Sequence, residues 1–185
     1  MNKVRFFRTP LRLDERAFEA VFNEHYNRVY TILFRMTGDP DSADDLAAET
    51  FWRLWERPPD QDENIAGWLY RVATRLGYNS MRGEKRRKQY ELDGLKADLD
   101  GRNSGEIDPE RAAEQRESRE RVRSVLRQMA LRDVQVLLLR HSGLSYKEIA
   151  AALEVGTTSV GTLLARAEAR FEALFGRGDD HAPER

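Results

Sequence analysis

Arginine and aromatic side chains recur along the segment Ile65–Lys88, which reads IAGWLYRVATRLGYNSMRGEKRRK. At the helical spacing of about 100° per residue, four arginines fall on one stripe, with Asn79 at its edge and Trp68 and Tyr78 on or beside it. The four are Arg71, Arg75, Arg82 and Arg86. Guanidinium groups bind phosphates, and rings stack on unpaired bases for about 1–3 kcal/mol per base. The stripe predicts a nucleic-acid surface; the alternative is an ordinary amphipathic helix with a basic solvent face.

The charge of the chain is unevenly distributed around this segment. Residues 39–63 hold nine acidic residues against two arginines, whereas residues 65–88 hold seven basic residues against one glutamate. The net charge of the whole chain is −1, so the overall charge gives no argument for nucleic acid. Two adjacent segments of opposite sign predict two partners of opposite character.

Composition excludes several classes of protein. With 185 residues, 40% hydrophobic and 34% charged, the chain suits one large or two small soluble domains. It has no cysteine, which rules out disulfides and cysteine-ligated metals. It has no run of 18 apolar residues, and its basic N-terminus has no apolar stretch long enough for a signal peptide. We therefore expect a cytoplasmic protein.

Apolar spacing predicts an all-helical fold. One helix begins at Asp14 and is broken by Gly38 and Pro40; the next begins with Asp41 as N-cap and ends before Pro58. The basic helix follows. Residues 89–115 show no sustained period and hold eight acids against three bases, which predicts a flexible acidic linker. Further helices are expected in residues 116–176, and a polar tail in 177–185. The prediction is two small helical domains joined by the linker.

The second domain contains a helix-turn-helix pattern. Ser145 can cap a helix that carries Ile149 and Ala150, and Val155 lies in a turn before a second helix that carries Val160. Ala150 precedes Val155 by five residues and Val160 follows it by five, which is the spacing of closely crossing helices. Glu154 stands where a glycine is common in such turns.

Three stretches together resemble one family. They are FNEHYNRVYTILFRMTGDPDSADDLAAETFWRLWE, GWLYRVATRLGYNSMRGEKRR and, after the linker, LLLRHSGLSYKEIAAALEV. Their order, and the patterns DxADDLxxExF and WLxRxAxxL, resemble the bacterial RNA polymerase sigma factors of the extracytoplasmic-function (ECF) group. The resemblance covers about residues 18–88 and 120–175. It implies a region 2-like domain in 1–88 and a region 4-like helix-turn-helix domain in 116–176.

The resemblance also implies site residues. The motif that docks on the β′ clamp helices of core polymerase corresponds to Asp44, Asp45, Leu46, Glu49 and Phe51. The −10 helix corresponds to Trp68, Arg71, Arg75, Asn79, Arg82, Lys85 and Arg86, and the loop 56–64 to the one that captures a flipped base. The −35 residues are Lys147, Thr158, Ser159, Gly161, Thr162 and Arg166. Many relatives carry Lys and Arg where this chain has Gly161 and Leu163, so Lys147, Arg166 and Arg170 are expected to carry more of the phosphate contact.

The implied partners are core RNA polymerase, through its β′ clamp and β flap, promoter DNA, and an anti-sigma factor. That factor hides both DNA-binding faces and can hold the protein at the inner face of the membrane. The resemblance implies no cofactor, metal, catalytic residue or small-molecule substrate. The linker is expected to thread toward the active cleft and RNA exit path of the polymerase.

Two other functions remain open from the residues alone. A helix-turn-helix regulator acting without polymerase would explain the second domain but leave the acidic helix and Trp68 unused. An enzyme would need a site, and Asp41, Asp45 and Glu49 at four-residue spacing could be hard-metal ligands, although a solvated helix start explains them better. Trp52 and Trp55 could bind a partner; we expect at least Trp55 in the core.

Overall fold

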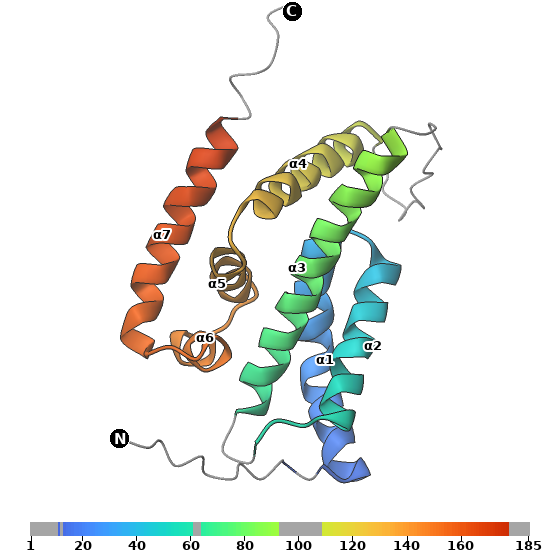
Figure 1. The fold of residues 1–185 in the computed structure, drawn as a ribbon, viewed down its shortest axis with the longest axis vertical. Coiled ribbons are helices and arrows are strands. Elements are labelled where there is room, and N and C mark those ends of the chain that lie inside the picture. Colours follow the sequence, from blue (N-terminus) through green and yellow to red (C-terminus); the bar gives the residue numbers. More distant parts are fainter. Residues whose placement is uncertain (1–10, 12, 61–63, 93–108, 178–185) are drawn as a thin grey trace, which may run out of the picture.

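The computed structural model describes residues 11, 13–60, 64–92 and 109–177, with the side chains of 84–92 and 109–112 excepted. These residues form seven α-helices and confirm the predicted all-helical class (Figure 1). In chain order they are α1 Glu15–Thr37, α2 Pro40–Glu56, α3 Ile65–Leu92, α4 Pro109–Gln128, α5 Leu131–His141, α6 Tyr146–Leu153 and α7 Thr157–Gly176. Both ends of the predicted linker 89–115 are therefore helical, and its middle, 93–108, lies outside the described residues.

Helices α1, α2 and α3 lie side by side in the N-terminal half (Figure 1). The carboxylate of Asp14 caps α1 by accepting the backbone N–H of Ala17 at 2.8 Å. The cap of α2 is Asp39, with Pro40 in the first turn, so the prediction of Asp41 as the cap was wrong. Proline is favoured in the first turn because it has no N–H that needs a partner there. The helix therefore begins two residues earlier in the chain than predicted. The core includes Ile32 and Leu33 of α1, Phe51 and Leu54 of α2, and Leu69 and Tyr70 of α3.

The C-terminal half has the predicted helix-turn-helix in α6 and α7. Ser145 caps α6 and exchanges hydrogen bonds with Glu148, which forms a full capping box. In the turn, Glu154 takes the left-handed conformation with φ 53°, a conformation that glycine usually adopts. The glutamate at this position therefore adopts the backbone conformation that a glycine commonly supplies in such turns.

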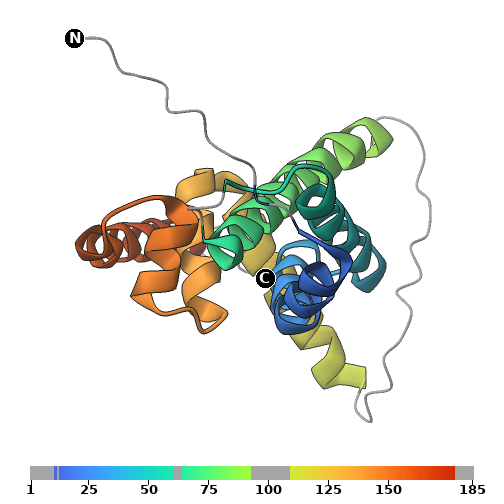
Figure 2. The ribbon, with the colours of Figure 1, turned by 90° about the horizontal axis from the view of Figure 1, so that it is seen from below.

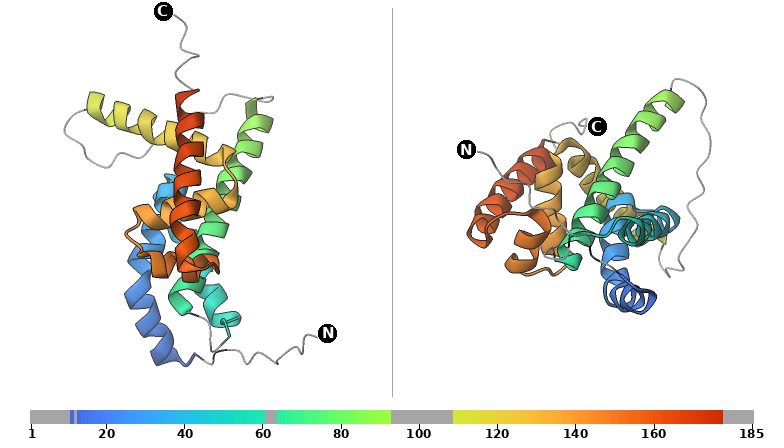
Figure 3. Two further views of the ribbon diagram at one scale, coloured as in Figure 1. Left: turned by 90° about the vertical axis from the view of Figure 1, so that its left-hand side faces the viewer. Right: turned by 60° about the horizontal axis from the view of Figure 1, so that its bottom comes forward.

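The two halves lie against each other, which the prediction of two flexibly linked domains did not include. Helices α5 and α6 pack on α3, so that one continuous apolar core crosses the boundary (Figures 1 and 2). At Gly67, an added Cβ would lie 3.0 Å from the backbone of Ala151 and Ala152. Helix α4 crosses one end of the molecule and contacts α7 (Figure 3). Helix α7 lies on the far side of α5 and α6 from α3 (Figure 2).

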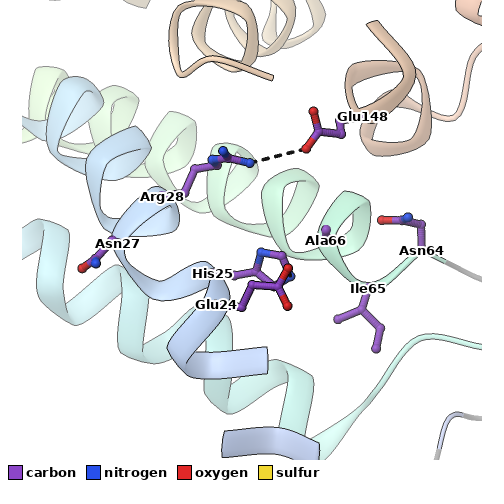
Figure 4. A pocket seen from close by; sticks show the side chains of 8 residues that line it. All are labelled: Glu24, His25, Asn27, Arg28, Asn64, Ile65, Ala66 and Glu148. Atoms are coloured by element: carbon purple, nitrogen blue, oxygen red, sulfur yellow. Dashed lines mark hydrogen bonds and ion pairs between the residues drawn. The ribbon is translucent and has the colours of Figure 1, made fainter. Parts of the chain in front are cut away.

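A pocket of about 750 Å³ opens at the corner where α1, α3 and α6 meet (Figure 4). In its wall, the Nδ1 atom of His25 lies 3.1 Å from the hydroxyl of Tyr70, and Arg28 donates to the same hydroxyl oxygen at 3.4 Å. The Tyr70 O–H can therefore donate to a neutral imidazole. Burial lowers the pKa of His25 below its ordinary value of 6.5, and the nearby Glu24 carboxylate opposes this shift.

Gly38 ends α1 in the left-handed region, with φ 73°, and a Cβ there would lie 2.1 Å from the Arg123 guanidinium. We expect Gly38→Ala to lower the free energy of unfolding by more than the ~1–2 kcal/mol of the backbone cost alone, because the Arg123 side chain is only 17% exposed and pairs with Glu120, so that it must leave this position to make room. Gly143→Ala is the matched control, because its φ is 83° and no atom lies within 4 Å of the added Cβ. Urea unfolding of both variants measures the difference. Equal losses would mean that Arg123 moves aside at no cost.

The lowered pKa of His25 predicts a pH dependence of stability. The unfolded chain binds a proton on this side chain more readily than the folded one, so stability is complete above about pH 6.5 and falls as the pH drops through the folded pKa. His25→Asn keeps an acceptor for the Tyr70 hydroxyl and removes the titration. Urea unfolding between pH 5 and pH 8 should give a flatter profile for the variant. Parallel profiles would contradict this account.

Candidate nucleic-acid interface

The basic stripe of α3 is divided between solvent and the C-terminal half. Arg75, Asn79 and Arg82 are exposed along one side of the helix. The Arg82 guanidinium lies 5.7 Å from the centre of the Tyr78 ring and donates to its hydroxyl at 3.4 Å, which orients this side chain. The predicted residues Lys85 and Arg86 belong to α3, but their side chains lie outside the described set. The exposed part of the stripe is therefore a short row of cationic and amide groups.

Other residues of the stripe contact the C-terminal half. The Arg71 side chain is 25% exposed, and its guanidinium pairs with the Glu154 carboxylate at 2.6 Å. Tyr78 is 7% exposed and donates its hydroxyl to the backbone carbonyl of Met129 at 2.9 Å, so its ring is not available to stack on a base in this arrangement. That part of the prediction was wrong, because helical spacing cannot show that a second domain covers the face. Trp68 is half-buried against the core.

Helix α2 presents the acidic surface. Asp44 and Asp45 are exposed, Leu46 is half-buried, and Glu49 pairs with Arg53 at 2.6 Å. Phe51 is 2% exposed, so it supports this surface from below and does not itself reach a partner. The expectation that Trp55 belongs to the core was wrong, because it is 46% exposed and Trp52 is 58% exposed. The acidic surface therefore has two large rings on the same helix.

An aromatic row on α1 was missed in the sequence. Phe18, Phe22, Tyr26, Tyr30 and Phe34 recur every four residues, and each ring contacts the next with centroids 4.8–6.4 Å apart. Tyr26 donates its hydroxyl to the Asp44 carboxylate, and this hydrogen bond raises the pKa of Tyr26 to about 12. The i, i+4 repeat of aromatic residues was the signal in the sequence. The row joins α1 to the acidic surface of α2.

The predicted −35 residues form a third surface on the helix-turn-helix. Thr158, Ser159, Thr162 and Arg166 are exposed on α7, and Lys147 is exposed on α6. Gly161 is half-buried, and a Cβ there would make an ordinary van der Waals contact with the Tyr146 ring at 3.8 Å. Leu163 is half-buried and Arg170 is exposed, with a contact to Asp133 at 3.5 Å. The exposed donors named on α7 are three hydroxyl groups and two arginines.

Neither a metal site nor a membrane span is found in the part of the chain that the structure describes. No group of three His, Asp or Glu residues there could hold a metal ion, which leaves the alternative of Asp41, Asp45 and Glu49 as ligands without support. No helix within the same residues is long and apolar enough to cross a membrane.

The chain matches two family profiles over the two halves of the fold. Residues 21–87 match Sigma-70 region 2, which comprises most of α1–α3. Residues 119–171 match Sigma-70, region 4, which comprises the end of α4 through most of α7. The exposed stripe and the acidic surface thus lie in region 2, and the helix-turn-helix lies in region 4.

Curated proteins give the same result. RNA polymerase sigma factor NccH of Alcaligenes xylosoxydans xylosoxydans is 30% identical over 169 residues, covering 88% of this chain and 88% of NccH. The ECF RNA polymerase sigma factor SigE of Mycolicibacterium smegmatis is 28% identical over 152 residues, covering 81% of this chain. The chain spans little more than half of SigE, 57% of its length.

A solved structure has a similar fold. The sigma factor RpoE, in complex with the anti-sigma factor NepR from Bartonella quintana, matches 87% of this chain and 98% of its own with a TM-score of 0.52 and 18% identity. With both profiles and the curated relatives in agreement, the chain belongs to the ECF group of RNA polymerase sigma factors, with region 2 at residues 21–87 and region 4 at residues 119–171.

Proposed function

We propose that this chain is a transcription initiation factor that binds core RNA polymerase and directs it to promoters through −10 and −35 elements. The observation that carries the proposal is the exposed row Arg75, Asn79 and Arg82 on a helix next to the acidic surface of α2. The factor itself does no chemistry. Melting comes from binding energy, because unpaired bases held by protein offset an unstacking cost of a few kcal/mol.

Region 2 is proposed to make two contacts. The row on α3, extended by Arg71, Lys85 and Arg86 and by Trp68, binds the −10 element and its melted strand. The acidic surface of α2, with Asp44, Asp45, Leu46 and Glu49, docks on the β′ clamp of the polymerase. A carboxylate-rich surface favours a basic partner, and steers its approach more than it adds affinity. The hydrogen bond from Tyr26 holds Asp44 in place for this contact.

Region 4 is proposed to read the −35 element with α7 and to contact the β flap. Thr158, Ser159, Thr162 and Arg166 are exposed where a recognition helix enters the major groove, and Lys147 and Arg170 supply charge for phosphates. Hydroxyl groups hydrogen-bond to several kinds of base edge, whereas arginine pairs bidentately with guanine. A modest base preference follows for this helix, so the −10 contact carries more of the promoter choice.

The further partner is an anti-sigma factor. RpoE, which shares the fold, is seen in complex with the anti-sigma factor NepR. We propose that a protein of this kind binds the present chain in the cytoplasm or at the inner face of the membrane. The domain division that serves these roles is 1–88, 116–176 and the acidic linker 89–115, with helix continuing to Leu92 on one side and beginning at Pro109 on the other.

The −10 role predicts the effect of removing two exposed arginines. Arg75→Ala with Arg82→Ala should reduce initiation at promoters mapped after overexpression, while binding to core polymerase is unchanged. The slope of log affinity against log salt should fall by about 0.7 for each lost phosphate contact to single-stranded DNA. Arg16→Ala with Arg119→Ala makes the same charge change elsewhere and serves as the control. Full activity of the Arg75 and Arg82 variant would remove this role from α3.

The docking role predicts the effect of neutralising the acidic surface. Asp44→Asn with Asp45→Asn should weaken association with core polymerase roughly tenfold, mainly by slowing the association rate at low salt. Glu114→Gln with Glu117→Gln changes the net charge equally on α4, where both side chains are exposed, and should leave association unaffected. Biolayer interferometry with purified core polymerase measures both. Equal affinities for the two variants would place the docking surface elsewhere.

A further inference from the structure

Tyr146 is the first residue of α6, and it is 40% exposed. Among the residues that the structure describes, the other large apolar side chains exposed by more than a third are Phe34, Trp52 and Trp55, and all three lie on α1 or α2. Tyr146 is thus the one such ring in region 4, and the proposed function gives it no role. A single exposed ring is ordinary on a protein surface, so its meaning depends on what surrounds it.

Arg140 holds the ring from one side. This exposed arginine lies in the last turn of α5, and its guanidinium carbon is 5.5 Å from the centre of the Tyr146 ring, within the range of a cation–π contact. The same guanidinium donates to the backbone carbonyl of Leu144 at 3.4 Å, which ties it to the turn before α6. A tyrosine side chain has two rotatable bonds, so a ring held in this way can bind a partner at a low cost in entropy.

Gly161 of α7 leaves one edge of the ring uncovered. A Cβ at Gly161 would lie 3.8 Å from the Cε2 atom of Tyr146, so any side chain at this position would start in contact with the ring. Apart from groups next to it in its own helix, the ring is the only described group within 4 Å of that Cβ position. The absence of a side chain at Gly161 therefore keeps the Cε2 edge of Tyr146 accessible from the α7 side.

The uncovered edge borders the surface that is proposed to read DNA. At the helical spacing of about 100° per residue, Thr158 and Leu164 lie about 60° to either side of Gly161. Leu164 is buried and Thr158 is exposed, so Gly161 marks the boundary between the core side of α7 and its exposed hydroxyl groups. The Tyr146 ring lies at this boundary, next to the row that begins at Thr158.

We propose that the Tyr146 ring is a further base-contacting group of region 4, and that it packs on the C5-methyl group of a thymine in the −35 element. The inference deepens the proposed role of α7 in the major groove and rests on it. In that groove the methyl group is the apolar feature that marks a thymine, whereas hydroxyl groups hydrogen-bond to several kinds of base edge. An aromatic ring beside the hydroxyl groups of α7 therefore adds a preference that they do not supply. Arg140 acts as a positioning residue for the ring.

Deoxyuridine tests this contact, because it pairs like thymine and lacks only the C5-methyl group. Each thymine of a duplex with the −35 element of a mapped promoter is replaced in turn. Binding by the full chain in complex with core polymerase is measured by competition with a labelled natural duplex. At one position the replacement should weaken binding about fourfold, which corresponds to the ~0.8 kcal/mol of one buried carbon group. The Tyr146→Ala complex should bind both duplexes equally at that position.

Tyr146→Phe is the matched control, because it keeps the ring and removes only the hydroxyl. It should retain the fourfold response to deoxyuridine. Equal losses of affinity in Tyr146→Phe and Tyr146→Ala, with the response unchanged in both, would show that the hydroxyl binds a phosphate and would overturn the proposal. A natural chain that responds to deoxyuridine at no position would overturn it as well. Alanine favours the helix at this exposed position, so Tyr146→Ala should keep the helix content of the natural chain by circular dichroism.

Arg140→Gln tests the positioning role. Loss of the cation beside the ring should reduce the response to deoxyuridine, whereas an arginine that only binds a phosphate would weaken binding to both duplexes by the same factor. An unchanged response in Arg140→Gln would remove the positioning role. A polymerase complex that binds the −35 duplex no better than a scrambled duplex would contradict the proposed function of region 4, and the thymine contact with it.

Discussion

The approach of α6 to α3 at Gly67 is the constraint on which the arrangement of the molecule depends. One residue without a side chain lets two helix backbones come within van der Waals distance, and this brings Gln135 to Thr74 and Glu154 to Arg71. Apolar burial supplies the energy of the contact, and the buried polar pairs select its register. This contact between α6 and α3 is why the two halves of the chain lie against each other although an acidic segment separates them in the sequence.

The contact between α6 and α3 also determines which residues of the basic stripe are exposed. Helical spacing places Arg71, Arg75 and Arg82 together, yet the fold treats them differently. Arg75 and Arg82 face solvent, whereas Arg71 already has a carboxylate partner. The arginines of this one helix therefore form two sets, one exposed to solvent and one paired with region 4. The same division separates Trp68 and Tyr78 from the rings that lie open on α2.

Much of the fold was predictable from the sequence because its signals are local. Asp14, Ser145 and the glycine at position 38 mark helix ends by hydrogen bonds and backbone angles that involve only neighbouring residues. The family motifs are local as well. The contact between halves depends on residues 60 to 120 positions apart, such as Thr74 with Gln135 and Arg28 with Glu148, and no period in the chain encodes it. The prediction that Trp55 lies in the core was wrong for the same reason, because the sequence of a helix does not show whether another element covers an apolar residue on it.

Glu148 has two attachments through one carboxylate. One oxygen accepts the Ser145 N–H that begins α6, and the other lies against Arg28 of α1, while the capping hydrogen bonds hold the pKa of this carboxyl below its ordinary range. The same Glu148 carboxylate therefore stabilises the first turn of α6 and the contact of α6 with α1. Unwinding of this turn would therefore also remove a contact with α1, but this pair is half-exposed, and the buried contacts of α5 and α6 with α3 remain to hold the two halves together.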